Sequence, residues 1–372
     1  LQDSLAQTLD QTNAALHIHP GVVLRHPDTV STQTGGAFKV FTAFWKASRR
    51  GLAVPEALPA PAEGCFLTHA LPGLANGEWD LLPTSPDWAA HWPELWRPGE
   101  AGAAAALEHF VTTGLGAYHT ARDLPGVPGT SRLSPHLHLG EVSPAQVWRA
   151  MQSTPVADDE AIDRYLGELG WREFNYYLLY HHPHLPEQPF RAPFKAFPWM
   201  AREDWFERWT QGNTGYPLVD AGMRELWHTG FMHNRVRMVC ASFLTKHLLL
   251  PWQWGARWFW DTLVDADLAN NSGGWQWVAG CGADAAPYFR IFNPVLQGEK
   301  FDRSGEYVRH WVPELAALPD KYLHAPWTAP NKILEHFDIA LGTTYPLPVV
   351  DHKEARAAAL AAYDVLPSAS SG

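Results

Sequence analysis

The segment 129–135 is the first in the chain whose residue types suit a phosphate group. It reads Gly-Thr-Ser-Arg-Leu-Ser-Pro. Hydroxyl groups, backbone N–H groups and an arginine in a tight segment are the donors that phosphate oxygens accept from. The alternative is a loop whose hydroxyl groups cap a helix, which is the commoner role of such residues. The segment is therefore a candidate phosphate site with a structural alternative.

A second set of residues is spaced to share one face of a helix. Glu168 is followed by Trp171, Arg172 and Asn175, at intervals of three, four and seven residues. A carboxylate and an indole facing one cavity are able to hydrogen-bond and stack a nucleic-acid base. The alternative is an ordinary helix with an exposed Glu–Arg pair, which leaves Trp171 unexplained.

The segment 230–238 adds amide, basic and sulfur-containing side chains. Helical spacing places Asn234, Arg237 and Met238 on one face, and Arg235 on another. The candidates for contact with phosphates in this part of the chain are Arg235, Lys246 and His247. The alternative is a run of solvated charges.

Acidic, amide, glycine and tryptophan residues are concentrated in the segment 265–277, which reads DADLANNSGGWQW. Carboxylates at this spacing occur in metal sites. No histidine lies in the run, however, and we expect no metal here.

The elements that must position these residues are helices. Apolar periodicity and helix-start signals, such as Ser143 before Pro144, predict one all-helical domain over residues 102–366. Residues 367–372 form a short polar tail. The helices that we expect are 103–113, 158–180, 217–227, 233–249 and 252–263.

The front of the chain has a different pattern. Residues 1–50 predict fragments of α/β structure: a helix over 1–15, a short buried strand over 21–24, and a helix over 38–48 with Lys39 and Lys46 exposed. Because each βαβ unit takes about 30 residues, we interpret this part as the remnant of an incomplete doubly wound domain. The proline-rich residues 51–101 predict a linker.

Composition limits the classes of protein. The chain has 372 residues, 46% of them hydrophobic, a formal net charge of −11 and three cysteines. The acidic balance weighs mildly against nucleic-acid binding, although only the binding face must be positive. No apolar run is long enough to span a membrane, and the scattered cysteines suit a reduced, cytoplasmic protein. The 19 tryptophans suit a core, a stacking surface or an electron-transfer chain.

The four clusters, in this order, resemble the photolyase/cryptochrome flavoprotein family from about Val23 to Tyr363. The resemblance rests on a set of blocks, none of which suffices alone: Thr130 to Ser134, Trp171 to Phe174, Met232 to Arg235, Asn271 to Trp277 and Asp284 to Pro294. The family combines an N-terminal doubly wound domain, a linker and a helical domain that holds FAD in a U shape.

The resemblance also implies roles for individual residues. The residues implied to bind FAD are Tyr118, Thr130, Ser131, Arg132, Leu133, Ser134, Arg172, Asn234, Arg237, Asp265, Asp267 and Asn271. The residues implied to bind the substrate are Arg122, Trp171, Arg235, Met238 and Trp277. Glu168, Asn234 and Asn271 are implied to take part in the reaction, with Asn271 facing the flavin N5 atom. A chain of Trp275, Trp252 and Trp199 is implied to carry electrons to the flavin.

The implied activity is light-driven repair of cyclobutane pyrimidine dimers in UV-damaged DNA by electron transfer from reduced FAD. Trp171, Trp277 and Asn271 favour a dimer photolyase, most like class I, over a non-repairing cryptochrome-like photoreceptor, which remains the alternative. The family's second, light-harvesting chromophore docks between the two domains. Its identity, folate or deazaflavin, stays open, and we expect its pocket to be incomplete. We expect a monomer.

Overall fold

The computed structural model describes residues 2–9, 12, 16, 21–56, 85–154, 159–285 and 289–367. In these ranges the regular structure is helical, and strand-type pairing is confined to one isolated bridge between Leu341 and Tyr345. Cys240 and Cys281 are buried free thiols, and Cys65 lies outside the described residues.

The N-terminal part differs from its prediction. It contains α1 (Gln2–Leu9) and α2 (Phe41–Arg49), and both Lys39 and Lys46 are exposed as expected. The predicted strand over 21–24 is wrong. This segment bends, and the Leu24 N–H donates to the Glu173 carboxylate at 2.8 Å in place of a strand partner. An apolar run of four residues does not distinguish a strand from a loop that packs on a helix.

The remainder of the described chain confirms the helical prediction. The long helix α8 (Asp159–His181) corresponds to the expected helix over 158–180. The other helices are α3 (Trp92–Leu95), α4 (Glu100–His109), α5 (Tyr118–Ala121), α6 (Ser134–Leu139), α7 (Pro144–Gln152), α9 (Glu203–Thr210), α10 (Pro217–Thr229), α11 (Asn234–Ser242), α12 (Trp252–Thr262), α13 (Leu268–Ala279), α14 (Pro294–Phe301), α15 (Glu306–Trp311), α16 (Asp320–Leu323), α17 (Asn331–His336) and α18 (His352–Asp364).

Local signals explain where the helices that matter most begin and end. Ser143 caps α7 through a reciprocal capping box with Gln146, as its sequence predicts. Asp267 caps α13 by accepting the Asn270 N–H, and Gly280 ends this helix with a φ of 90°. The left-handed conformation at Gly280 is one that glycine adopts at low cost.

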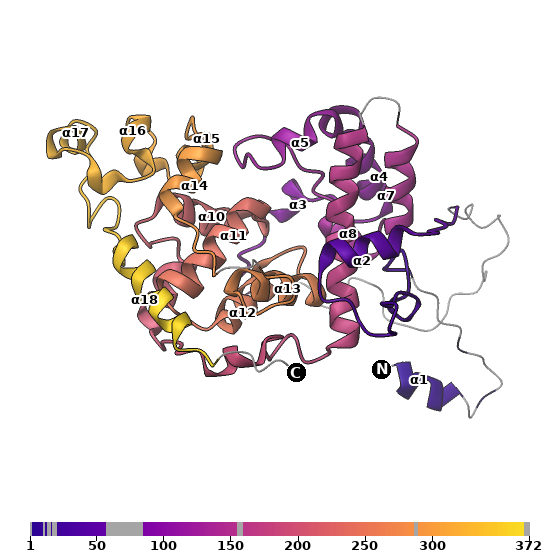
Figure 1. The fold of residues 1–372 in the computed structure, drawn as a ribbon. Coiled ribbons are helices and arrows are strands. Elements are labelled where there is room, and N and C mark those ends of the chain that lie inside the picture. Colours follow the sequence, from indigo (N-terminus) through magenta and orange to yellow (C-terminus); the bar gives the residue numbers. More distant parts are fainter. Residues whose placement is uncertain are drawn as a thin grey trace.

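The buried hydrophobic residues form two cores, and the predicted site residues come from helices of both. One surrounds α8 and includes Phe44 and Tyr177, and the other surrounds α10 to α13 and includes Trp252 and Trp275. In Figure 1, α2 crosses α8, and α10 to α13 lie between α8 and the C-terminal helices α14 to α17. The site residues therefore come from helices of both cores.

Two glycines allow α13 to approach its neighbours closely. A Cβ atom at Gly255 on α12 would lie 2.0 Å from the Trp275 ring, and a Cβ at Gly273 would lie 2.2 Å from the Asn175 side chain on α8. Any larger residue would push these helices apart. The glycines thus fix the distance between α13 and the helices on either side.

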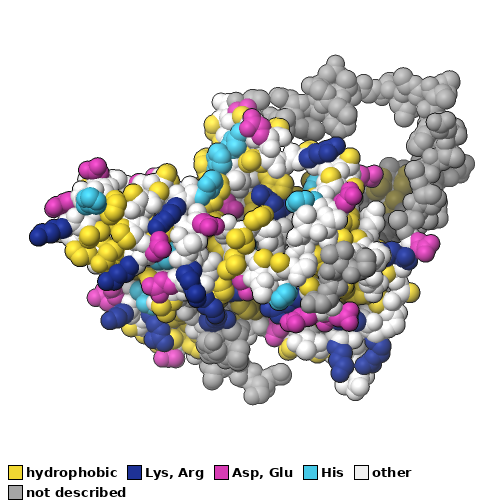
Figure 2. All heavy atoms as spheres, turned by 90° about the horizontal axis from the view of Figure 1, so that it is seen from above, with side chains coloured by type: hydrophobic (Ala, Val, Ile, Leu, Met, Phe, Trp, Pro, Cys, Tyr) yellow, Lys and Arg dark blue, Asp and Glu magenta, His cyan; other side chains and the backbone are white. Residues whose placement is uncertain are grey.

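The surface carries charges of both signs. On the face shown in Figure 2, basic and acidic side chains are interspersed, with hydrophobic side chains between them. No helix in the described ranges is long and apolar enough to cross a membrane.

Candidate functional site

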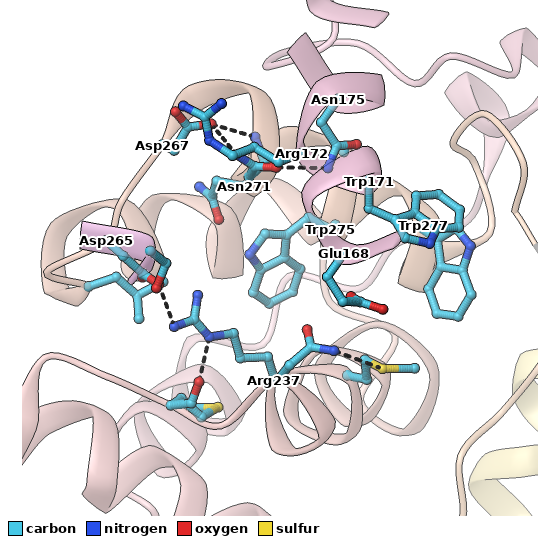
Figure 3. A pocket seen from close by; sticks show the side chains of 18 of the residues that line it. Glu168, Trp171, Arg172, Asn175, Arg237, Asp265, Asp267, Asn271, Trp275 and Trp277 are labelled. Atoms are coloured by element: carbon cyan, nitrogen blue, oxygen red, sulfur yellow. Dashed lines mark hydrogen bonds and ion pairs between the residues drawn. The ribbon is translucent and has the colours of Figure 1, made fainter. Parts of the chain in front are cut away.

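A cavity of about 590 Å³ lies between α5, α8, α11 and α13. It brings together all the predicted site residues except Trp199, Trp252, Lys246 and His247. The predicted residues that line it are Tyr118, Arg122, Thr130, Ser131, Arg132, Leu133, Ser134, Glu168, Trp171, Arg172, Asn234, Arg235, Arg237, Met238, Asp265, Asp267, Asn271, Trp275 and Trp277. In the view of Figure 3, Trp171 and Trp277 lie at one end of the cavity, and Asp265 and Asp267 at the other.

The predicted phosphate segment forms one wall. Arg132 has a φ of 52°, and its guanidinium lies 4.6 Å from the ring centres of both Trp96 and Phe231. The Tyr165 hydroxyl donates to the Ser131 hydroxyl at 2.9 Å. Burial raises the pKa of Tyr165 to about 12, so this phenol remains a neutral donor. Cation–π contacts and a buried donor therefore hold this wall in place.

The predicted face of α8 is confirmed, because Glu168, Trp171, Arg172 and Asn175 all line the cavity. In the structure, two of these side chains are hydrogen-bonded to other parts of the protein. Arg172 donates to the backbone carbonyls of Val22 and Leu137. The Asn175 amide donates to the side chain of Asn270 on α13 at 3.0 Å. Arg172 thus links the N-terminal segment to α6, and its predicted contact with FAD stays a prediction.

Both arginines that we predict to bind DNA phosphates are paired with carboxylates. Arg122 donates to Glu168 at 2.5 Å, and Arg235 donates to Asp123 at 2.6 Å. Arg235 lines the cavity together with Asn234, although helical spacing predicts a different face for it. The long arginine side chain reaches the cavity wall from its own side of the helix.

The other two predicted phosphate contacts are wrong. Lys246 and His247 are only 2% and 3% exposed, in a π-helical turn, Phe243–His247, that follows α11. The Lys246 ammonium donates to the carbonyl of Arg290, and the His247 ring pairs with His352 at 2.8 Å. Charged residue types suggest exposure, but here the backbone turns both side chains into the core.

A partly buried ion pair and an unpaired oxygen face one end of the cavity. Arg237 donates to Asp265 Oδ2 at 3.0 Å and to the Met232 carbonyl at 2.6 Å. The Asp265 side chain is 4% exposed, and its second oxygen, Oδ1, has no hydrogen-bond partner among the described residues. A buried carboxylate oxygen without a partner is costly, which favours a ligand that donates to it.

Two further predicted residues at this end have defined partners. The carboxylate of Asp267 accepts from Asn270, Tyr176 and His138, so both of its oxygens are bonded. Asn271 donates through Nδ2 to the Ala256 carbonyl at 2.9 Å. Because a carbonyl only accepts, the Asn271 amide oxygen is left to accept from another group.

The three tryptophans of the predicted electron chain differ in burial and in their position relative to the cavity. Trp275 lines the cavity, Trp252 is fully buried, and Trp199 is partly buried. The Trp275 ring contacts Trp209 at 6.2 Å and Phe259 at 4.9 Å between centres. No ring contact is found among Trp275, Trp252 and Trp199 themselves, all three of which are described.

Several cavity residues were missed by the sequence analysis. Tyr165 lies one turn before Glu168 on α8, and helical spacing was a signal that could have found it. Asp123, which pairs with Arg235, directly follows Arg122 but carries no signal of its pairing. The contact of His138 with Asp267 spans two helices and is invisible in the sequence. No group of three or more potential ligands suited to a metal ion is found among the described residues.

Comparison with protein families assigns most of the chain. Residues 165–365 match the model of the FAD binding domain of DNA photolyase. Residues 1–62 match the model named DNA photolyase. The first match covers more than half of the chain, and it includes the Glu168, Arg237 and Asn271 positions. The prediction of FAD as the cofactor is therefore confirmed.

Similar proteins carry related names. The chain is 50% identical over 363 residues to the deoxyribodipyrimidine photo-lyase of Agrobacterium fabrum, which covers 97% of this chain and 75% of that enzyme. It is 40% identical over 343 residues to cryptochrome-1 of Arabidopsis thaliana, covering 90% of this chain and 50% of the cryptochrome.

A solved structure supports the same assignment and corrects its detail. The fold matches a bacterial class III photolyase from Agrobacterium tumefaciens with a TM-score of 0.91 and 48% identity, covering 98% of this chain and 76% of that one. Our class I expectation therefore differs from this neighbour, because a few site residues shared across classes do not separate them. The family expectation is confirmed: the chain belongs to the photolyase/cryptochrome family.

Proposed function

We propose that this chain is a deoxyribodipyrimidine photo-lyase, which repairs cyclobutane pyrimidine dimers in DNA with blue light and reduced FAD. The observation that carries the proposal is the set of residues that line one cavity. The residues suited to a flavin, Arg237, Asp265 and Asn271, line the same space as those suited to a flipped pyrimidine dimer. Relatives named photo-lyase support the same activity.

The cavity fits FAD in size and in chemistry. Its volume of about 590 Å³ lies within the range of about 300–1,000 Å³ that is usual for ligand sites. The free Oδ1 of Asp265 suits an N–H group of the flavin ring, and the neighbouring Arg237 guanidinium suits a ring that gains negative charge on reduction. The free amide oxygen of Asn271 suits the N5–H of reduced flavin.

The other FAD-binding roles follow the segment 130–134 and its neighbours. Thr130, Ser131 and Ser134 supply hydroxyl groups to the phosphates, and Arg132 supplies a cation that Trp96 and Phe231 hold between them. Leu133 is buried and anchors the segment. We propose that Tyr118, Arg172, Asn234 and Asp267 also contact the cofactor.

The substrate occupies the opposite end of the cavity. Trp171 and Trp277 provide two indole surfaces for an extruded dimer, and Met238 provides an apolar contact. Glu168 hydrogen-bonds a pyrimidine edge, and Asn234 lies between substrate and cofactor. Photolyases act on extruded nucleotides, and extrusion costs a few kcal/mol, least for a damaged pair, which contributes to selectivity.

The chain's own groups position the reaction. Reduced FAD, held by Arg237, Asp265 and Asn271, would supply light-driven one-electron donation to the dimer, and the electron would return once the two bonds of the cyclobutane ring are broken, so that the overall reaction is redox-neutral. The aromatic walls exclude water from the dimer, and Glu168 and Asn234 hold its polar edge. Trp275, Trp252 and Trp199 serve a separate, preparatory reduction of oxidised flavin.

Binding of DNA requires positively charged side chains near the cavity that contact the phosphates. Arg122 and Arg235 contact phosphates that flank the lesion after leaving their present carboxylate partners. With a formal net charge of −11, the chain depends on such local cations for its affinity.

We also propose the domain boundaries that the sequence predicts. Residues 1–50 belong to the family's α/β domain, residues 51–101 to the linker, residues 102–366 to the helical FAD domain, and residues 367–372 to a tail. The match of residues 1–62 to the DNA photolyase model supports the first assignment. Residues 57–84 and 368–372 lie outside the described residues. We propose a monomer and leave the antenna chromophore open.

The test uses an oligonucleotide that carries one cyclobutane thymine dimer. We expect the FAD-loaded, chemically reduced protein to remove the dimer under blue light and not in the dark. The Glu168→Gln variant is expected to repair at least about tenfold more slowly at low substrate concentration, because a charge-assisted hydrogen bond is lost. Bound, reduced FAD without any light-dependent repair would contradict the proposal and favour a non-repairing, cryptochrome-like photoreceptor.

A further inference from the structure

Phe41 stacks directly on Trp171. The two ring centres are 3.9 Å apart, and the planes differ by 9°. Phe41 is the first residue of α2, whereas Trp171 belongs to α8. Trp171 lines the cavity, but Phe41 is not among the described residues that line it. One face of the Trp171 indole is therefore occupied by the protein, and the rest is available to a substrate.

Other rings hold this pair in place. Phe174 meets Trp171 edge-on at 5.9 Å and Phe41 at 6.1 Å. Trp45, one turn along α2, lies parallel to Phe41 at 6.4 Å. Such contacts restrict the rotation of an indole about its side-chain bonds, because any other orientation would break several ring pairs.

Asp284 connects this pair to the second tryptophan wall. Its carboxylate accepts the Phe41 backbone N–H at 3.1 Å, and its backbone carbonyl accepts the Trp277 indole N–H at 3.1 Å. Val40, at the start of α2, makes no side-chain capping bond, so the cap of this helix comes from Asp284.

The backbone of Asp284 is adapted to this position. Its φ of 50° lies in the left-handed region, which aspartate and asparagine tolerate better than most residues. In this conformation the carbonyl and the carboxylate serve two different segments. The loop after α13 is thereby bonded to the Phe41 backbone on α2, and Phe41 stacks on Trp171. The same loop is bonded directly to the Trp277 indole.

We infer that Phe41 and Asp284 are positioning residues that set the orientation and separation of Trp171 and Trp277 around the extruded dimer. The inference rests on the proposed repair function and extends it to residues outside the cavity. Neither residue touches the substrate. Each acts through an indole that does, so their loss weakens recognition of the lesion before it affects the cofactor.

The first experiment compares Phe41→Leu with Phe41→Tyr. Leucine keeps an apolar side chain but removes the flat ring, whereas tyrosine keeps the ring. We expect Phe41→Leu to weaken binding of dimer-containing DNA about fivefold, which is the size of effect that one aromatic pair produces. We expect Phe41→Tyr to bind as the parent does. Phe38→Leu is the matched control, since the Phe38 ring contacts Phe44 and Tyr177 instead.

The second experiment tests the tie at Asp284. Glycine at this position keeps the left-handed backbone but removes the carboxylate, and asparagine keeps both the conformation and an acceptor oxygen. We expect Asp284→Gly to weaken dimer binding about threefold and Asp284→Asn to restore it. These two variants decide the question if Phe41→Leu does not fold.

Three measurements distinguish a positioning role of Phe41 and Asp284 from a general role in the stability of the fold. Binding of undamaged DNA, the FAD content, and the repair rate at saturating substrate are each expected to stay within about twofold of the parent. Dimer binding unchanged in both Phe41→Leu and Asp284→Gly overturns the inference, and so does an equal loss for damaged and undamaged DNA. A parent protein that repairs no dimer in light contradicts the proposed function instead.

Discussion

Arg122 and Glu168, which both line the cavity, form an ion pair with 2.5 Å between Nη1 and Oε1. Arg122 follows α5 and its side chain is 11% exposed, while Glu168 on α8 is 37% exposed. The proposed substrate contacts of the two residues, a DNA phosphate and a pyrimidine edge, both require this pair to open. The pair thus keeps the two groups that we propose to bind the substrate mutually neutralised in the free protein.

The salt dependence of DNA binding tests whether Arg122 leaves Glu168 to contact a DNA phosphate. We expect Arg122→Gln to weaken binding of damaged and undamaged DNA alike and to reduce the slope of log K against log salt by about one, because one phosphate contact is lost. Arg202→Gln is the control, since Arg202 pairs with Asp204 in an exposed position away from the cavity. An unchanged slope with a loss confined to damaged DNA would mean that Arg122 acts only by orienting Glu168.

Removal of the charge of Asp265 tests the cofactor end of the cavity. We expect Asp265→Asn to lose about 3 kcal/mol of unfolding free energy and to release FAD during gel filtration, because Arg237 loses a buried partner. Denaturant unfolding and the visible absorbance of the eluted protein provide the measurements. Asp204→Asn removes one partner of an exposed pair and is expected to change neither. Retention of both stability and FAD in Asp265→Asn would argue against this assignment.

The tryptophan chain predicts a defect in light-driven reduction of the flavin. We expect Trp252→Phe to block photoreduction of bound oxidised FAD, because phenylalanine is far harder to oxidise than tryptophan. Repair by chemically reduced protein is expected to continue, since we propose that these tryptophans serve only the preparatory reduction of the flavin. Trp260→Phe on the same helix is the control, because Trp260 is 49% exposed. Unchanged photoreduction in Trp252→Phe would show that electrons take another route, such as the Trp209 ring that contacts Trp275.

Glu173 gives the fold a defined pH dependence. Burial raises the pKa of Glu173 to about 7, from an ordinary value of 4.5, despite the N–H groups of Leu24 and Arg25. The folded state therefore binds this proton more tightly, and the associated stability is complete below about pH 4.5 and lost as the pH rises through 7. We expect Glu173→Gln to gain up to about 3 kcal/mol relative to the parent between pH 5 and pH 8.

Thermal unfolding of both proteins across this range provides the measurement. Burial also lowers the pKa values of His233 and His247, to about 4 and about 3, and that of Lys246 to about 7. The contribution of these three groups to stability decreases as the pH falls, which is opposite to the contribution of Glu173. Because the groups are present in both proteins, their contributions cancel in the stability difference between Glu173→Gln and the parent. Parallel stability curves for the two proteins would contradict the role of Glu173.

The local part of the site was predictable from the sequence. Side chains three, four and seven residues apart share one face of any helix, so Glu168, Trp171 and Asn175 were expected together and do line one cavity. Helix-start signals such as Ser143 and Pro144 were equally reliable, because a cap depends only on neighbouring residues.

Predictions failed where the neighbours in space were unknown. The segment 21–24 has the composition of a strand, but the backbone N–H of Leu24, like that of Arg25 directly after it, donates to Glu173 on α8. Lys246 has the residue type of an exposed position, but a π-helical turn directs it into the core. In both cases tertiary contacts overrode the local preference.

The sequence by itself determined which chemical groups the protein has, which of them share a helix face, and which family the chain resembles. Only the tertiary structure decided which partner each group meets: Glu168 with Arg122, Asp123 with Arg235, and Phe41 with Trp171. The physical reason is that these pairs are far apart in the chain. Helix periodicity fixes neighbours within a few turns, whereas contacts between helices depend on how the whole core packs.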